Sequence, residues 1–312
     1  MHIVFCADRR VLPGLHVAAY SLVDRFDSSS DQPIITVFSD ALDDDDIALL
    51  DQTLARANNP YSLHLHRIDS SKFSDFPPLN GSWATYYRLY AAQTMEVDRF
   101  LYVDADTLCD VDVSELRCMD MADKPAAWVP EAPLKEAVDY EVAEQLKGNS
   151  DDVYFNAGVI LINTLPWRKQ QISERAMDYI AKKRPIFHDQ SALNVLLYDQ
   201  ALKLDSKFNC MSNMRKNWPF IKHTYGKNNR LIHFLDYPKP WDLSAEWVHP
   251  QYELWRTVLN KTALQDFRSW HQTAARKLPN SKKAWHGYQK SIKDRLLFSF
   301  YRRSWLTNVK GI

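Results

Sequence analysis

Short apolar runs rich in β-branched and aromatic residues alternate along the chain with segments whose apolar residues recur at helical spacing. The runs predict buried strands, and the segments between them predict amphipathic helices. The strand-like runs cover residues 2–7, 33–39, 61–68, 100–103, 126–129, 153–163 and 230–234. The helical patterns cover residues 15–23, 43–54, 82–93, 167–183 and 188–197. This alternation predicts an α/β fold in which helices flank a central sheet.

Two carboxylates end the central apolar run. Phe100 to Val103 is followed by Asp104 and Asp106, and in extended backbone residues i and i+2 point to the same side. Open α/β sheets bind ligands at the carboxyl edge of their strands, so this pair predicts a site for one cation. Asp110 and Asp112 have the same spacing without such a run before them. Chance occurrence in an acidic segment is the alternative explanation.

Three other features have both a structural and a functional interpretation. Arg88 is the one strong cation of an aromatic, alanine-rich helical stretch, and predicts either an ion pair or an anion-binding group. The small residues Ala157 and Gly158 inside an apolar strand predict close approach by a ligand or by another backbone segment. The acidic run 43–46 favours the first turn of a helix over a calcium site.

Composition narrows the class of protein. With 312 residues, 46% of them hydrophobic and 25% charged, the chain has the make-up of an ordinary globular protein. Its 39 Lys and Arg balance 39 Asp and Glu, so the overall charge favours no nucleic-acid partner. We expect a cytoplasmic location, because secretory and membrane-spanning patterns are absent and the four cysteines form no zinc or disulfide pattern.

The carboxyl-terminal segment differs in character. From Arg276 onward ten Lys and Arg residues face the single acid Asp294, and aromatic and leucine residues are interleaved among them. A basic amphipathic helix of this kind favours attachment to an anionic membrane surface. Nucleic-acid binding and docking onto the rest of the chain are the alternatives.

Four motifs together resemble glycosyltransferase family eight, which includes bacterial lipopolysaccharide galactosyl- and glucosyltransferases and the glycogenins. They are Tyr102–Asp106, Phe155–Asn163, the pair Asp189 and Gln190, and the segment from His233 to Trp241. The resemblance runs from about residue 1 to about residue 245. It implies a GT-A fold with a Rossmann-like mixed sheet, a UDP-galactose or UDP-glucose donor, Mn2+, and transfer with retention of configuration.

The resemblance also implies roles for individual residues. The expected metal ligands are Asp104, Asp106 and His233. The expected donor-binding residues are Cys6, Asp8, Arg88, Asp104, Ala105, Glu131, Asn156, Asp189, Gln190 and Lys239. Asp189 and Gln190 are the expected catalytic pair at the sugar, Asp8 is expected at the uridine, and Lys239 at the diphosphate. Glu131 is expected near both donor and acceptor.

Some positions depart from the family pattern. Ser191 follows the Asp-Gln pair where Asp is common, and Asp236 stands where Gly is frequent. Arg10 and Val11 replace an Asn and an aromatic residue, which bears on how the base is held. Asp189 and Ser191 also have a purely structural interpretation as helix caps.

The chemistry of the residues agrees with the resemblance. A departing nucleoside diphosphate gathers negative charge that a divalent cation offsets as a Lewis acid. Two carboxylates alone suit Mg2+, and an added imidazole shifts the preference toward Mn2+. UDP needs no proton to leave, so no glycosidase-like acid pair is required. The amide of Gln190 is a poor nucleophile, which favours front-face attack over a covalent intermediate, although both routes stay open.

These observations predict two parts, a GT-A catalytic domain at 1–250 and a helical basic region at 251–312. The leading hypothesis is a retaining, metal-dependent hexosyltransferase at the inner face of the membrane. Its acceptor would be lipopolysaccharide or another lipid-linked cell-surface saccharide. The alternatives are a non-catalytic module that binds sugar nucleotides or membranes, and a self-glucosylating enzyme like the glycogenins.

Overall fold

The computed structural model describes residues 1–79, 81–146, 152–212, 224–235, 238–242, 245–249, 251–268 and 289. A seven-stranded mixed sheet has the strand order β3-β2-β1-β4-β7-β6-β8, and a second sheet has the order β5-β10-β9. The strands of the large sheet are β1 (His2–Cys6), β2 (Ile34–Ser39), β3 (Ser62–Arg67), β4 (Arg99–Val103), β6 (Ala126–Pro133), β7 (Val153–Asn163) and β8 (Leu202–Lys203). Those of the small sheet are β5 (Thr107–Cys109), β9 (Cys210–Ser212) and β10 (Leu231–Phe234). The predicted α/β class is confirmed.

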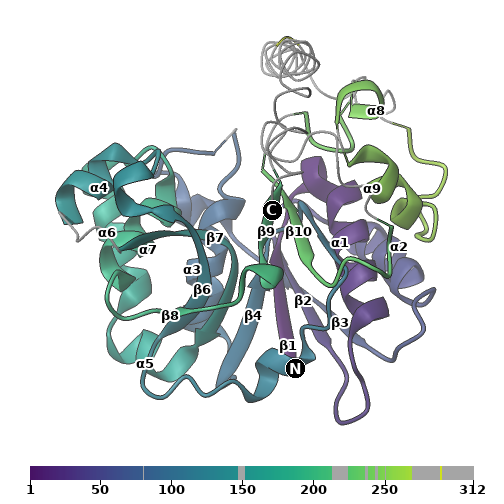
Figure 1. Ribbon diagram of the computed structural model, residues 1–312, viewed down its shortest axis with the longest axis horizontal. Coiled ribbons are helices and arrows are strands. Elements are labelled where there is room, and N and C mark those ends of the chain that lie inside the picture. The colour runs from purple at the N-terminus through teal and green to yellow at the C-terminus, as the bar shows by residue number, and fades with distance from the viewer. Residues whose placement is uncertain are drawn as a thin grey trace, which may run out of the picture.

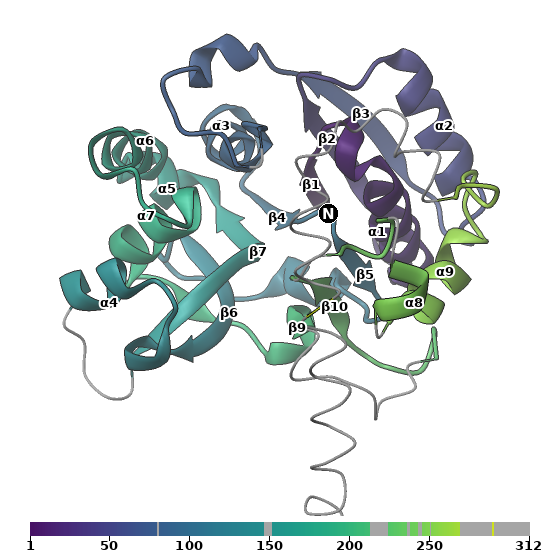
Figure 2. The same cartoon turned by 90° about the horizontal axis from the view of Figure 1, so that it is seen from above.

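Helices cover both faces of the large sheet (Figure 1). The helices are α1 (Leu12–Arg25), α2 (Asp44–Leu54), α3 (Tyr87–Thr94), α4 (Tyr140–Leu146), α5 (Thr164–Lys169), α6 (Ile172–Lys183), α7 (His188–Leu197), α8 (Ala245–Val248) and α9 (Tyr252–Leu259). Helices α1, α2 and α9 lie on one side, and α3, α5, α6 and α7 lie on the other, as the view from above also shows (Figure 2). Among the described residues, no helix is both long and apolar enough to cross a membrane.

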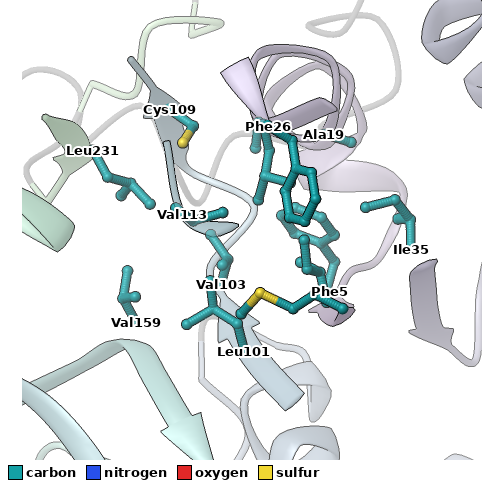
Figure 3. Close-up of a cluster of buried hydrophobic side chains, with 14 of the residues drawn as sticks. Phe5, Ala19, Phe26, Ile35, Leu101, Val103, Cys109, Val113, Val159 and Leu231 are labelled. Atoms are coloured by element: carbon teal, nitrogen blue, oxygen red, sulfur yellow. The ribbon is translucent and has the colours of Figure 1, made fainter. Parts of the chain in front are cut away.

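Alternate residues of the central strands pack into two different cores. Ile3 and Phe5 of β1 pack with Leu101 and Val103 of β4 under α1 (Figure 3). The residues between them, among them Val4 and Tyr102, belong to a second core under α3, α6 and α7. A strand that is buried on both faces reads as a continuous apolar run, which is why its sequence signal was clear.

The acidic run is the start of a helix, as predicted. Asp43 is the N-cap of α2, and its side chain accepts a hydrogen bond from the backbone N–H of Asp46, while the side chain of Asp46 accepts one from the backbone N–H of Asp43. This capping box and the helix dipole account for the clustered acids. Arg9 pairs with the same two carboxylates from outside the helix.

Two predicted elements differ from the structure. The helix predicted at 167–183 is two helices, α5 and α6, because Gln171 adopts a left-handed conformation with φ of 53°. No glycine or proline marks this break at positions 170–171, so the sequence carried no signal for it. The strand predicted at 126–129 continues to Pro133 as β6, which carries Glu131 beyond the core.

Residues 251–268 pack on the outer side of α1. Trp255 and Val258 of α9 are buried against Val17 and Tyr20 of α1, together with Trp241. The predicted membrane-binding residues from Arg276 onward lie outside the described residues, apart from Gln289. The division at residue 250 therefore stays a prediction.

Candidate active site

Asp104 and Asp106 lie in the three-residue connection that carries the chain from β4 in the large sheet to β5 in the small one. The connection is a turn, so the argument from extended backbone was wrong, although the two carboxylates do converge. The backbone N–H of Asp104 donates to the carbonyl of Gly158 at 2.7 Å, which ties the turn to β7. The turn ends the central strand and opens the small sheet, so its position is set by both.

His233 reaches the two acids through the register of the small sheet. In the antiparallel pair of β5 and β10, His233 lies opposite Thr107, and the backbone N–H of Phe234 donates to the carbonyl of Asp106 at 2.9 Å. Its Nε2 lies 3.2 Å from Oδ1 of Asp106 and 3.7 Å from Oδ2 of Asp104. One ligand atom from each of the three residues fits within 4.8 Å.

The imidazole of His233 packs directly on Gly158. A Cβ atom at position 158 would lie 2.1 Å from Cε1 and 2.5 Å from Nδ1 of the ring, so only glycine leaves room for it. The predicted close approach is therefore confirmed at Gly158, where the side chain of His233 makes it. Close packing of this kind fixes where the ring can lie.

A chain of amides determines which nitrogen of His233 faces the acids. Oδ1 of Asn156 accepts from the backbone N–H of Gly158 at 2.9 Å, which fixes which end of the amide is the oxygen. The same oxygen accepts from Nδ2 of Asn209, also at 2.9 Å. Oδ1 of Asn209 is then the acceptor for Nδ1–H of His233 at 3.0 Å. This tautomer leaves Nε2 as the nitrogen available to a metal, and such partners typically orient metal-binding histidines.

Arg88 forms ion pairs with two buried or half-buried acids, Asp104 and Asp189. Its guanidinium pairs with Asp104 at 3.2 Å and with Asp189 at 3.0 Å, donates to the carbonyl of Ala157, and lies 4.2 Å above the ring of Tyr102. The ion-pair interpretation of Arg88 is confirmed. Asp189 is buried by this pair and by a hydrogen bond from Thr85, so it is not a helix cap.

The cations shift the protonation of the acids in different ways. Burial raises the pKa of the Asp104 carboxyl and outweighs the opposing charge of Arg88. Burial acts in the same direction on Asp106, but Lys239 and His233 together outweigh it and hold the pKa of that carboxyl below its usual range. Burial lowers the pKa of Arg88, but the surrounding negative groups, Asp189 first, raise it by more than burial lowers it. The net shift is upward, so the guanidinium stays charged.

Lys239 brings a second cation to the same place. Its Nζ lies 2.7 Å from Oδ2 of Asp106 and donates to the carbonyls of Phe234 and Leu235. The side chain of Asp242 accepts from its backbone N–H at 2.8 Å. Lys239 is only 8% exposed, so it is not a solvated loop residue.

A first cavity of about 200 Å³ opens beside these groups. Its lining residues are Cys6, Asp8, Arg10, Val11, Leu79, Ser82, Ala84, Thr85, Arg88, Tyr102, Asp104, Ala105, Asp106, Lys239, Trp241 and Asp242. Cys6, Asp8, Arg88, Asp104, Ala105 and Lys239, six of the residues expected to bind the donor, therefore share one cavity. Arg10 donates to both carboxylate oxygens of Asp8, from its backbone N–H to Oδ1 and from its guanidinium to Oδ2. Burial would raise the pKa of Asp8, but this pairing lowers it.

The remaining expected residues lie around this cavity rather than in its lining. Gln190 accepts from the backbone N–H of Ala157 at 2.9 Å and donates to the hydroxyl of Tyr154 at 3.2 Å. Asn156 is buried in the amide chain behind His233. Ser191 donates to the buried carboxylate of Asp139, so an acid lies beside position 191 although the chain has no Asp there. Asp236 lies outside the described residues.

Glu131 lies in a second cavity, of about 320 Å³. The residues lining this second cavity are Glu131, Ser206, Lys207, Asn209, Cys210, Met211, Asn229, Arg230 and Leu235. Two of these lining residues, Asn209 and Arg230, were not predicted from the sequence as site residues. Asn209 precedes His233 by 24 residues and belongs to no recognisable motif, so only the pairing of β9 with β10 brings the two together.

The donor set suits a divalent cation. Two carboxylates and an imidazole nitrogen lie within reach of one another. This set suits Mn2+, because the imidazole shifts the preference away from Mg2+, which the carboxylates alone would also bind. The tautomer of His233 and the space that Gly158 leaves for its ring agree with this role. The residues present therefore fit a metal.

The class of protein follows from the fold and the cluster. A mixed sheet flanked by helices, with acids in the connection from its central strand to a small second sheet, is an α/β fold of the GT-A type. Residues 2–245 match the family model of Glycosyl transferase family 8. The chain belongs to this family and is a glycosyltransferase.

Individual relatives agree with the family. General stress protein A of Bacillus subtilis (strain 168) is 26% identical over 289 residues, which cover 83% of this chain and 96% of that protein. Lipopolysaccharide 1,2-glucosyltransferase of Escherichia coli is 28% identical over 250 residues, which cover 73% and 72%. The crystal structure of galactosyltransferase LgtC in complex with donor and acceptor sugar analogs superposes with a TM-score of 0.69 at 22% identity. It covers 84% of this chain and 96% of that one, and supports the fold.

Proposed function

We propose that this glycosyltransferase moves galactose or glucose from a UDP-sugar to a saccharide acceptor, with the help of a divalent metal and with retention of configuration. The observation that carries the proposal is the convergence of Asp104, Asp106 and His233 at the edge of the first cavity. Two cations, Arg88 and Lys239, lie against the same acids. A diphosphate is the ligand class that needs a divalent cation and nearby cationic side chains together.

Each side chain has a role in this proposal. Asp104, Asp106 and His233 hold the metal, which when bound acts as a Lewis acid toward the departing diphosphate. Mn2+ is the proposed ion, because the set includes an imidazole. Lys239 carries a charge that can turn from Asp106 to the diphosphate. The remaining donor contacts are assigned to Cys6, Asp8, Arg88, Ala105, Glu131, Asn156, Asp189 and Gln190.

The hydrogen bonds of Gln190 and Asp189 bear on the route of retention. Both ends of the Gln190 amide are engaged, with Ala157 and with Tyr154, which suits a group that positions the sugar. Asp189 is buried against Arg88 and Thr85. Neither arrangement favours a covalent intermediate, because an amide is a poor nucleophile and the carboxylate is already neutralised. We therefore propose front-face attack, in which the departing phosphate takes the proton of the acceptor hydroxyl.

The acceptor is proposed to be lipopolysaccharide or another cell-surface glycan. The names of the relatives include lipopolysaccharide glucosyl- and galactosyltransferases, which supports this acceptor class. The ten cations of the segment from Arg276 onward support attachment to the inner face of an anionic membrane, where a lipid-linked acceptor would lie.

Donor hydrolysis without acceptor tests the proposal. The full chain is incubated with UDP-galactose or UDP-glucose, with and without Mn2+, and release of UDP and free hexose is followed. A transferase releases sugar slowly to water in the presence of Mn2+ only. No turnover with any UDP-sugar, despite binding, would instead identify a non-catalytic module. A mass increase of the protein itself by hexose units would identify self-glucosylation.

A further inference from the structure

The second cavity is lined by Glu131 of β6, by Cys210 and Met211 of β9, and by Arg230 and Leu235 on either side of β10. Figure 2 shows where these strands lie in the fold. At about 320 Å³ the cavity falls at the lower end of the range of small-ligand sites, roughly 300–1000 Å³. It is therefore large enough for a small polar ligand.

Its inner wall is shared with the metal cluster. Asn209 lines the cavity and orients His233. Leu235 also lines it, and its carbonyl accepts from Nζ of Lys239 in the first cavity at 3.1 Å. Oε2 of Glu131 accepts from Asn156 at 3.3 Å, which joins Glu131 to the same amide chain. A molecule in the second cavity would lie next to the groups that surround the donor.

Within the part of the chain that the structure describes, two charged side chains of this cavity have no ionic partner. Glu131 and Arg230 line it together but form no ion pair with each other or with any other residue in the described part of the chain. With the described residues, Arg230 makes a 3.3 Å hydrogen bond to the carbonyl of Asn228 and a 3.7 Å contact to Sγ of Cys210. Lys207, the other cation of the cavity, is already paired with Glu115 at 2.6 Å. Among the described lining residues, Arg230 is thus the cation that a ligand can pair with.

The loop that presents Arg230 is firmly held. The buried carboxylate of Asp110 accepts from the backbone N–H of Gly226 and from the backbone and side-chain nitrogens of Asn228, at 2.7–2.9 Å. The backbone N–H of Asp110 donates to the carbonyl of Arg230 at 3.0 Å. Because the backbone is held in advance, only the side chain of Arg230 has to be ordered when it binds an anion.

We propose that the second cavity binds the acceptor and that the acceptor is an anionic saccharide, with its phosphate or carboxylate on Arg230 and a hydroxyl on Glu131. This inference rests on the proposed function and names its acceptor class. Guanidinium groups bind phosphate and carboxylate through paired hydrogen bonds, whereas Glu131 repels an anion and accepts from hydroxyls. The two charges therefore set the direction of the saccharide, with its neutral hydroxyl end toward the metal cluster.

The test uses three matched sugars: glucose, glucose 6-phosphate and glucuronate, together with the corresponding galactose series. Binding to the full chain is measured by saturation-transfer NMR with UDP and Mg2+ present, so that the first cavity is filled and no paramagnetic ion disturbs the signal. We expect at least one anionic sugar to bind about tenfold or more tightly than its neutral counterpart. Whether the phosphate or the carboxylate gives the preference identifies the source of the charge. Equal binding of all three sugars would overturn the inference.

Variants locate the preference. Arg230→Gln should abolish it, and Arg230→Lys should keep part of it, because the charge remains while the paired geometry is lost. The matched control is Lys227→Gln, which removes the same charge from an exposed position of the same loop outside the cavity, and should keep the full preference. A preference that survives in Arg230→Gln, or that Lys227→Gln removes equally, would contradict the assignment. Donor hydrolysis by the parent chain separates this inference from the proposed function. If the parent chain hydrolyses the donor but shows no preference for anionic sugars, the transferase proposal stands and only the anionic acceptor class is wrong.

Discussion

The two cavities differ in how their charges are balanced. Of the four carboxylates that line the first, three meet a cation of the chain itself: Asp8 meets Arg10, Asp104 meets Arg88, and Asp106 meets Lys239. The fourth, Asp242, accepts from the backbone N–H of Lys239. In the second, Glu131 and Arg230 lie in one cavity and neither has an ionic partner among the described residues.

The difference indicates two kinds of ligand. Charges that are paired before the ligand arrives are held in place. When the ligand binds, each charge exchanges its protein partner for a ligand group. Such a cavity suits a metal ion together with a diphosphate, because the two bring both signs of charge. Unpaired charges at the edge of a cavity attract a ligand by its own charge and select against the wrong one. We therefore propose that the first cavity positions its ligands and that the second selects its ligand by charge, and the following experiments test this contrast.

The largest effect is expected from the acids of the first cavity. Asp104→Asn or Asp106→Asn removes a metal ligand while keeping the size of the side chain. Metal assistance amounts to several kcal/mol, so metal-dependent donor hydrolysis should fall by roughly a thousandfold or more. The shift in melting temperature that UDP and Mn2+ produce together should also disappear.

Asp112→Asn is the matched control for the acids. Asp110 and Asp112 repeat the spacing of the two ligands, but Asp112 accepts hydrogen bonds from the backbone of Asp27 and Ser114, away from both cavities. Hydrolysis should stay at the parent rate. Unchanged hydrolysis in both ligand variants would refute the metal site.

Gly158→Ala tests how tightly the first cavity is organised. The added Cβ would lie 2.1 Å from Cε1 of His233, so either the ring or β7 must move. Overpacking of this kind costs about 1–3 kcal/mol of stability, and displacement of the imidazole should also weaken Mn2+ binding. Urea unfolding and titration calorimetry with Mn2+ measure the two effects. Parent-like values in both would show that the ring has room to move.

Asn209 lines the second cavity and accepts a hydrogen bond from His233 beside the first. Its replacement tests whether the orientation of the His233 ring affects metal binding. Asn209→Leu removes the acceptor for Nδ1–H of His233, and Mn2+ affinity should fall about 10–100-fold, as for other partners of metal-binding histidines. Asn209→Asp keeps an acceptor at the same place and should lose less. Titration with Mn2+, followed by calorimetry, ranks the two variants. An equal loss in both would mean that packing, not the hydrogen bond, positions the ring.

The smallest effect concerns two buried imidazoles that belong to neither cavity's lining. Burial lowers the pKa of His16 and of His249 to about 3 in each case, from 6.5. The unfolded chain therefore binds more protons between pH 3 and 6.5, and the free energy of unfolding rises with pH across that window. Each imidazole contributes up to about 1.4 kcal/mol per pH unit, and this stability is lost as the pH falls.

Urea unfolding between pH 4.5 and 6 measures this slope above the range in which most carboxylates titrate. His16→Gln should reduce the slope of the unfolding free energy against pH by the contribution of one imidazole, up to about 1.4 kcal/mol per pH unit. His249→Gln should reduce it by the same amount. A slope that neither change affects would show that these imidazoles are not kept neutral by the fold.

Much of the fold was predictable because its signals are local. Strands β1, β2, β4 and β7 are buried on both faces, so each is a continuous apolar run that differs from the helices around it. The acids Asp43 to Asp46 were correctly interpreted as a helix start because capping depends on residues three positions apart. The break at Gln171 was missed because a left-handed non-glycine residue has no reliable sequence signal.

The candidate site divides in the same way. By itself, the sequence determined the α/β alternation, the acids after the central strand, and, through motif resemblance, the family and six residues of the first cavity. Only the tertiary structure decided that a turn makes the acids converge, that Gly158 makes room for His233, and that Asn209 orients its ring. Only it showed Glu131 and Arg230 in one cavity, without ionic partners among the residues that the structure describes. The reason is physical: these relations depend on how β10 pairs with β9 and with β5, the latter more than 100 residues away in the chain, and no local pattern encodes that pairing.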